Sequence, residues 1–133
     1  MSLAAQDALR LLIQAHAHNR LAHAYLITGP KGSGKQSLAL GLGAHLLRCP
    51  PENTLSHPDA HPVSPESKSR RITVEQMRAL EQEIRMRSLK GGAKVAVIFD
   101  ADRLVPSAAN AFLKTLEEPP LHTYILLLSE QPE

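Results

Sequence analysis

Several features that define common classes of protein are scarce in this sequence. Cys49 is the single cysteine, so no disulfide can form within the chain, which fits a reducing compartment such as the cytoplasm. Tryptophan is absent and aromatic residues make up only 3% of the chain, so we expect no nucleic-acid surface built on stacked rings. No run of about 18 apolar residues is present, so we expect no membrane partner. The formal net charge of +2 is too small to indicate a polyanionic ligand.

The overall composition is that of a folded domain. The 133 residues are 43% hydrophobic and 21% charged, and this length corresponds to one domain or a piece of one. Proline is the exception, because ten are present and five of them lie between Pro50 and Pro65. We therefore predict a proline-rich irregular loop over about 49–71, with one short strand near 61–64.

Hydrophobic periodicity predicts helices that alternate with buried strands. Helices are expected over about 4–18, over 35–48, from a capping box at Thr73 and Gln76 to the glycines at 91 and 92, and from 107 to the prolines at 119 and 120. Continuous apolar runs predict strands over 24–28, 95–99 and 124–128, each buried on both faces. The alternation predicts an α/β fold in which helices cover both faces of a parallel sheet. Because the chain ends soon after its last strand, we expect residues 1–133 to be part of a larger protein.

A glycine-rich segment between the first strand and the second helix has the spacing of a phosphate-binding loop. It reads glycine, four residues, glycine and lysine, from Gly29 to Gly34 and Lys35, with a further glycine at Gly32. Glycines let backbone N–H groups turn toward one centre, the helix N-terminus adds positive potential, and the lysine reaches the outer phosphates. We therefore predict the architecture of a phosphate loop at this position.

The residues that would bind magnesium at such a loop are incomplete. Gln36 stands where a serine or threonine hydroxyl would bind the metal, and Ser37 lies about 100° further around the helix. Such a centre also needs two adjacent acidic residues at the end of the 95–99 strand, one to bind the metal and one in the catalytic position, and no such pair is present. In one alignment Asp100 is the metal carboxylate and Ala101 occupies the catalytic position. In the other, Phe99 occupies the metal position and Asp100 the catalytic position. We therefore expect no catalytic residue, no bound metal and no hydrolysis by this chain, while weak ATP or ADP binding stays open.

A string near the end of the chain resembles a known family. The segment Asn110-Ala111-Phe112-Leu113-Lys114-Thr115-Leu116-Glu117-Glu118-Pro119-Pro120 looks like the signature of AAA+ clamp-loader subunits. His23-Ala24-Tyr25-Leu26, leading into Gly29-Pro30, is similar to the first strand and loop of that family. The resemblance implies a three-layer αβα, RecA-like AAA+ core over 1–133, truncated before its last strand, with the lid and collar domains outside the chain. It also makes Ser129 a candidate sensor residue, and Glu117 and Glu118 candidates for helix termination and subunit contact.

The departures from the ATPase motifs resemble one branch of that family. They are typical of the delta-prime subunits of the bacterial DNA polymerase III clamp loader, and His57-Pro58-Asp59 and Ile72-Thr73-Val74 are also similar to that branch. The resemblance implies a non-hydrolysing stator within a nucleotidyltransferase holoenzyme, which helps to load the sliding clamp on primed DNA. Its direct partners would be the ATPase motor and clamp-opening subunits, and it would meet the clamp and DNA indirectly, through the complex.

Two further expectations concern cofactors and the rival function. Relatives carry a four-cysteine zinc module in the region of Cys49, but one thiolate cannot form a structural zinc site, so we expect no zinc and no required cofactor. The alternative function is an active, ATP-hydrolysing motor subunit of the tau/gamma type, which would need a working magnesium centre.

Overall fold

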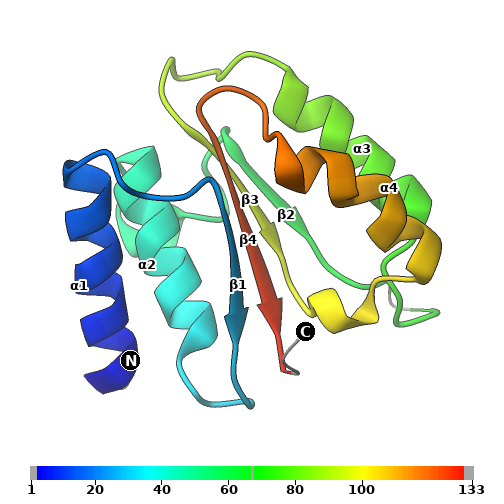
Figure 1. The fold of residues 1–133 in the computed structure, drawn as a ribbon, viewed down its shortest axis with the longest axis horizontal. Helices are drawn as coiled ribbons and strands as arrows, with labels where there is room; N and C mark the ends of the chain where they lie inside the picture. The colour runs from blue at the N-terminus through cyan, green and yellow to red at the C-terminus, as the bar shows by residue number, and fades with distance from the viewer. Residues whose placement is uncertain (1–2, 67, 131–133) are drawn as a thin grey trace.

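Helices cover both faces of a parallel sheet in the computed structural model, which describes residues 3–66 and 68–130 (Figure 1). The strands are β1 (Ala24–Thr28), β2 (Ala60–Val63), β3 (Lys94–Ile98) and β4 (Thr123–Ser129), in the order β1-β4-β3-β2. The helices are α1 (Leu3–Ala17), α2 (Lys35–Leu47), α3 (Val74–Arg85) and α4 (Pro106–Glu117), with 3-10 turns η1 (Pro51–Asn53) and η2 (Ala101–Arg103). In Figure 1, α1 and α2 lie on one side of the sheet and α3 and α4 on the other. The predicted three-layer αβα arrangement is confirmed.

The central strand β3 is buried along its whole length, because each of its faces meets a pair of helices. Val95 and Val97 pack with α2, whereas Ala96 and Ile98 pack with α3 and α4. The largest buried side chains on the α3 and α4 face are Ile72, Met77, Leu80, Ile84, Ile98, Phe112 and Ile125. Two separate apolar layers therefore hold the sheet.

The prediction that the first strand is buried on both faces is wrong. Its residues alternate between half-buried and exposed, and Leu26 is 42% exposed. Within the described sheet, β1 pairs with β4 alone and lies at the edge. Tyr25 and Ile27 pack against the α1 and α2 layer, and Leu26 projects to the opposite face. An apolar run cannot distinguish an edge strand from a central one, because position in the sheet is set by long-range pairing.

The predicted capping box at the start of α3 is confirmed, but the helix ends earlier than its sequence suggests. Thr73 Oγ1 accepts from the Gln76 backbone N–H at 3.2 Å, and Gln76 Oε1 accepts from the Thr73 N–H at 2.9 Å. The last helical residue is Arg85, not a residue beside Gly91. The ammonium group of Lys94 donates to the carbonyl of Ile84 and, at 2.7 Å, to that of Met86. A buried lysine of the next strand thus holds the helix end, and its burial lowers the pKa of its ammonium group.

The proline-rich segment 49–71 contains more regular structure than predicted. It includes η1, and the short strand expected near 61–64 is β2, which pairs with β3. Thr54 is fully buried, and its hydroxyl donates to the carbonyl of Leu40 at 3.0 Å. A Cβ at Gly43 would lie 2.9 Å from Thr54 Cγ2, so the segment packs directly on α2. None of the helices in the described residues is long and apolar enough to cross a membrane.

Asp59 is a buried carboxylate that connects this segment to the turn before β3. It accepts hydrogen bonds from Ser88 Oγ at 2.7 Å and from the backbone N–H groups of Leu89 and Lys90 at 2.6 and 2.9 Å. Burial alone would raise the pKa of this carboxyl group, but these three donors outweigh burial and lower it below its usual 3.8. The charged form of Asp59 is therefore favoured by folding.

We expect Asp59→Asn to lower the free energy of unfolding by about 1–3 kcal/mol at neutral pH, because an amide cannot accept all three hydrogen bonds. A carboxyl group whose pKa is lowered by folding stabilises above its unfolded pKa, and that stabilisation is lost as the pH falls through the folded value. The difference between the two proteins should therefore shrink below about pH 4. Urea unfolding at pH 7 and at pH 3.5 measures both effects.

Asp7→Asn is the matched control, because Asp7 forms only a surface pair with Arg10, its side chain being 65% exposed. It should change stability by less than about 0.5 kcal/mol at either pH. Equal losses from the two substitutions would contradict the role given to Asp59.

Candidate functional site

The predicted phosphate loop lies between β1 and α2, where its glycines have conformations that other residues rarely adopt. Gly32 and Gly34 have φ angles of 82° and 92°, and Gly34 is the residue that precedes α2. A Cβ at Gly29 would lie 2.6 Å from Ser33 Oγ, so the loop folds back closely on its own first residue. The Gly29 N–H donates to the carbonyl of Ser129 at 3.1 Å, which attaches the loop to the end of β4.

A cleft of about 620 Å³ opens between this loop and the carboxyl ends of β3 and β4. This is the edge of a parallel sheet at which α/β proteins bind ligands. The lining residues are Lys31, Gly32, Gly34, Lys35, Gln36, Ser37, Phe99, Asp100, Leu128 and Glu130. The structure therefore brings the predicted loop residues, except Gly29, together with Phe99 and Asp100, which follow β3.

Lys35 begins α2, and its ammonium group donates to the carbonyl of Pro30 at 3.3 Å. Gln36 and Ser37, the next two residues, are both exposed and both line the cleft. The side chain at the first of these positions is an amide, which is a weak ligand for a cation that prefers compact oxygen coordination. The cleft thus has Lys35 at the predicted phosphate-binding position and offers no hydroxyl at position 36.

The residues that follow β3 bear on the two alignments that the sequence left open. Phe99 and Asp100 line the cleft, while Ala101 and Asp102 are not among its lining residues in the described chain. Asp100 has a φ of 53°, and this left-handed residue turns the backbone into η2. This lining is consistent with the alignment that has Phe99 in the metal position and Asp100 in the catalytic position, and the assignment of these positions stays a prediction.

The candidate sensor residue Ser129 is buried at the end of β4. Its hydroxyl donates to Asp102 Oδ1 at 3.3 Å, and Ser129 is not among the residues that line the cleft. Its neighbour Glu130 does line the cleft and was not singled out from the sequence. The signal for Glu130 was its place directly after a predicted parallel strand, at the edge where ligands bind.

Magnesium fits poorly into this set of donors. The carboxylates of the cleft are those of Asp100 and Glu130, on two exposed residues, and the positions that would supply the closest ligands hold Gln36 and Phe99. In the described residues, no group of three or more histidine, cysteine, aspartate or glutamate side chains is placed to hold a metal ion. We derive no metal-dependent step at this cleft.

The segment 110–120, which resembles the clamp-loader signature and lies mostly in α4, is away from the cleft. Some of its side chains are buried and others are exposed. Phe112 and Thr115 are buried, and Thr115 Oγ1 donates to Glu81 of α3 at 2.5 Å. The opposite side of the helix is exposed at positions three or four residues apart: Asn110, Leu113, Lys114 and Glu117. Leu113 is 53% exposed. We call these four residues the α4 face.

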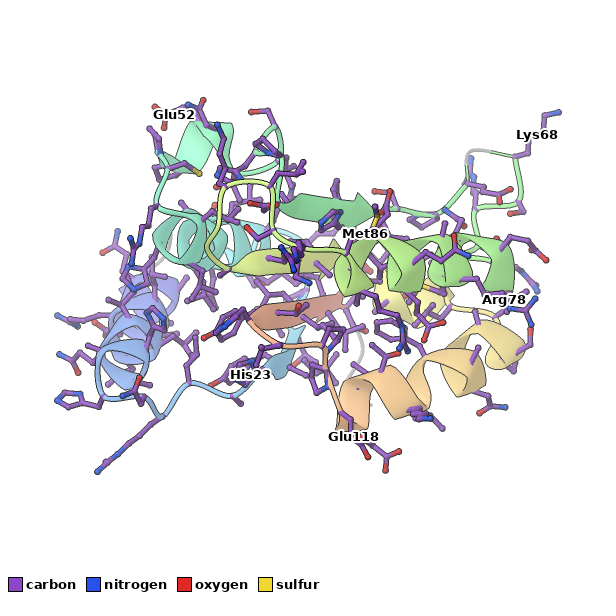
Figure 2. The ribbon with its side chains drawn as sticks, turned by 90° about the horizontal axis from the view of Figure 1, so that it is seen from above. His23, Glu52, Lys68, Arg78, Met86 and Glu118 are labelled. Atoms are coloured by element: carbon purple, nitrogen blue, oxygen red, sulfur yellow. The ribbon has the colours of Figure 1, made fainter. Side chains whose placement is uncertain are left out.

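The last residues of this segment, Glu118 and Pro119, end α4. The Glu118 N–H donates to the carbonyl of Lys114 at 2.9 Å, and Pro119 then prevents the helix from continuing. Figure 2 shows Glu118 at the end of the helix with its side chain projecting away from the sheet. The predicted role of this segment in helix termination agrees with the structure, and its role in subunit contact stays a prediction.

A parallel sheet of this order, with a phosphate loop between β1 and α2 and a cleft at the carboxyl strand ends, is a RecA-like AAA+ core of the P-loop class. The family described as "DNA polymerase III, delta subunit" matches residues 4–133, and the chain belongs to that family.

Curated relatives and solved structures agree with this assignment. The chain is 35% identical to the DNA polymerase III subunit delta' of Bacillus subtilis, covering 94% of this chain and 41% of the relative. It is 33% identical to the corresponding subunit of Escherichia coli, covering 92% and 41%. A DNA polymerase III gamma subunit-related protein of Thermotoga maritima superposes with a TM-score of 0.71 at 25% identity, covering 95% of this chain and 39% of that one. The chain thus spans about two fifths of the curated relatives it matches.

We expect Gly32→Ala to destabilise the protein by about 1–2 kcal/mol, because a Cβ is strained in the left-handed region. Nothing lies within 4 Å of a Cβ placed at Gly32, so backbone strain is the only penalty. Gly92→Ala is the matched control, since a Cβ there also meets nothing within 4 Å and its φ is not in that region. It should be neutral or stabilise by up to about 1 kcal/mol. Urea unfolding measures both, and equal effects would contradict the loop geometry.

Proposed function

We propose that this chain is the AAA+ core of a delta-prime-like subunit of a bacterial DNA polymerase III clamp loader. In this function it acts in the cytoplasm as a stator, a rigid subunit that hydrolyses no ATP and supports its neighbours while they load the sliding clamp on primed DNA. Membership of the family supports the proposal, as do relatives named as delta' subunits at 33–35% identity.

The observation that carries the proposal is the composition of the cleft. The loop glycines and Lys35 are those of a nucleotide site, but Gln36 and Phe99 stand where a hydroxyl and a carboxylate would bind magnesium. Without the metal, the charge that develops on the phosphates during transfer is not neutralised. The site is therefore expected to bind ATP or ADP weakly, without a requirement for magnesium, and to hydrolyse neither.

The proposed partners are other clamp-loader subunits, namely the ATPase motors and the clamp-opening subunit. The α4 face is our candidate contact surface, because it combines an exposed leucine with a lysine and a glutamate on a helix held firmly from behind by Phe112 and Thr115. An apolar residue surrounded by polar ones is the usual composition of a protein interface. The sliding clamp and primed DNA would be met through the assembled complex.

The rival function is an ATP-hydrolysing motor subunit of the same loader. Two observations support it. The chain is 33% identical over 126 residues to a DNA polymerase III subunit tau/gamma of Haemophilus influenzae, and it covers 18% of that relative. Lys35 is also present in the cleft. A motor needs a complete magnesium centre, however, and Gln36 and Phe99 are incompatible with one.

We expect the full-length protein alone to release no phosphate from ATP above the buffer rate, with or without magnesium. Titration calorimetry with ADP should give the same weak affinity in both conditions, because no metal is bound with the nucleotide. A motor subunit of the same loader is the positive control for phosphate release. Magnesium-dependent turnover that is lost in Lys35→Ala would overturn the stator proposal.

We expect Leu113→Asp to weaken co-purification of the full-length protein with its clamp-loader partners by at least about tenfold, because a charge at the centre of an interface costs more than about 1.4 kcal/mol. Leu11→Asp is the matched control, since Leu11 is a 65% exposed leucine of α1, outside the α4 face. Its complex should form as in the unmodified protein. Assembly by the Leu113 variant at full strength would remove the α4 face from the interface.

A further inference from the structure

Two histidines of different helices form a direct hydrogen bond at the end of the molecule remote from the phosphate loop. His16 lies near the C-terminal end of α1 and His45 near that of α2. Nδ1 of His16 and Nε2 of His45 are 3.0 Å apart, and the two rings are perpendicular with centroids 5.0 Å apart. One ring nitrogen must donate and the other must accept, so at least one imidazole of the pair is neutral.

The pair is continued by two more rings that connect it to the sheet. The ring of Tyr124, on β4, meets His16 edge to face at a centroid distance of 6.1 Å. His23, which precedes β1, stacks on the other side of Tyr124 at 4.6 Å, and its Nδ1 is 2.9 Å from the carbonyl of Thr123. The end of α1 and the connection into β1 are therefore attached to β4 through this row of rings.

The surroundings of the pair offer little to stabilise a second proton. Its neighbours across the adjoining cavity of about 1190 Å³ include the titratable or charged groups Arg48, Cys49, His57, Asp59, Lys90, His122 and Tyr124. Asp59 is the single carboxylate among them, and its oxygens already accept three hydrogen bonds from the 88–90 turn. Burial, and then the proximity of His16, lower the pKa of His45 below 6.5.

The other end of the α1–α2 contact does not depend on titratable groups. A Cβ at Gly41 would lie 2.8 Å from Leu9 Cδ2, so the two helices approach closely there through an apolar contact. Leu12 and Ala15 of α1 also pack on the α2 side of the core. Acid pH would leave this contact intact and act on the histidine end alone.

We propose that His16 and His45 form a pH-sensitive clasp. The hydrogen bond between their rings holds the C-terminal turn of α1 on α2. The clasp opens when both imidazoles are protonated. With both rings charged, each nitrogen is a donor, so the hydrogen bond is lost and two like charges stand about 3 Å apart. The turn of α1 and the 18–23 connection then separate from α2 and Tyr124.

The sign of the pH dependence follows from linkage. The unfolded chain binds a proton at His45 near pH 6.5, whereas the folded chain binds it only at lower pH. The clasp therefore contributes fully above about pH 6.5, and its contribution is lost as the pH falls from there through the folded pKa.

The test compares the thermal midpoint of the full-length protein with that of His45→Gln and His16→Gln between pH 7.5 and 5.5. Glutamine is neutral at every pH in this range, so we expect the unmodified protein to lose about 2–4 °C more than either variant. His18→Gln is the matched control, because His18 lies just beyond α1 and is exposed, with Nδ1 2.9 Å from the Gln14 carbonyl. It should keep the pH dependence of the unmodified protein.

A second measurement decides the question even where a variant folds poorly. Imidazole ¹⁵N chemical shifts of the unmodified protein should show that His45 takes up its proton in the same pH step in which its hydrogen bond to His16 is lost. Amide exchange of the last turn of α1 should accelerate across that step. Unchanged amide exchange of that turn while His45 is protonated, or equal pH dependence of the midpoint in His45→Gln and the unmodified protein, would overturn the proposal.

Discussion

The pairing of β3 with β4 in the middle of the sheet is the constraint on which the rest of this structure depends. Every residue of β3 is buried, so both of its faces need a helical layer, and the two layers hold the strands in parallel. Parallel pairing places the carboxyl ends of β3 and β4 at the same edge as the loop after β1. The cleft is a direct consequence of that arrangement, whichever side chains line it.

This separation of scaffold and chemistry explains how the chain can keep a nucleotide fold without a motor's magnesium centre. The loop conformation depends on glycines and on the bond from Gly29 to β4, neither of which requires a metal. Of the two positions that would bind magnesium, Gln36 is exposed in the cleft, whereas Phe99 lines the cleft and also packs against the apolar layer under α1 and α2. Such a core, with the cleft that we propose to be inactive, is compatible with the proposed stator function.

Polar groups hold the periphery to this core in two different ways. Asp59 and Lys94 are buried and hydrogen-bonded, so the turn before β3 and the end of α3 are firmly held. The His16–His45 pair attaches α1 through a hydrogen bond between two imidazole rings, which can form only while at least one of them is neutral. The outer helix is therefore the element of this domain whose attachment responds to pH.

The sequence by itself determined the layers, the loop and the departures at its magnesium centre, because these depend on local spacing: apolar runs, the Thr73 capping box and the glycines before Lys35. Only the tertiary structure decided that β1 lies at the edge, that Lys94 holds the end of α3 at Arg85, and that Phe99 rather than Ala101 lines the cleft. Each of these depends on contacts between residues distant in sequence. No local pattern encodes which strand lies beside which, or which buried charge a helix end will meet.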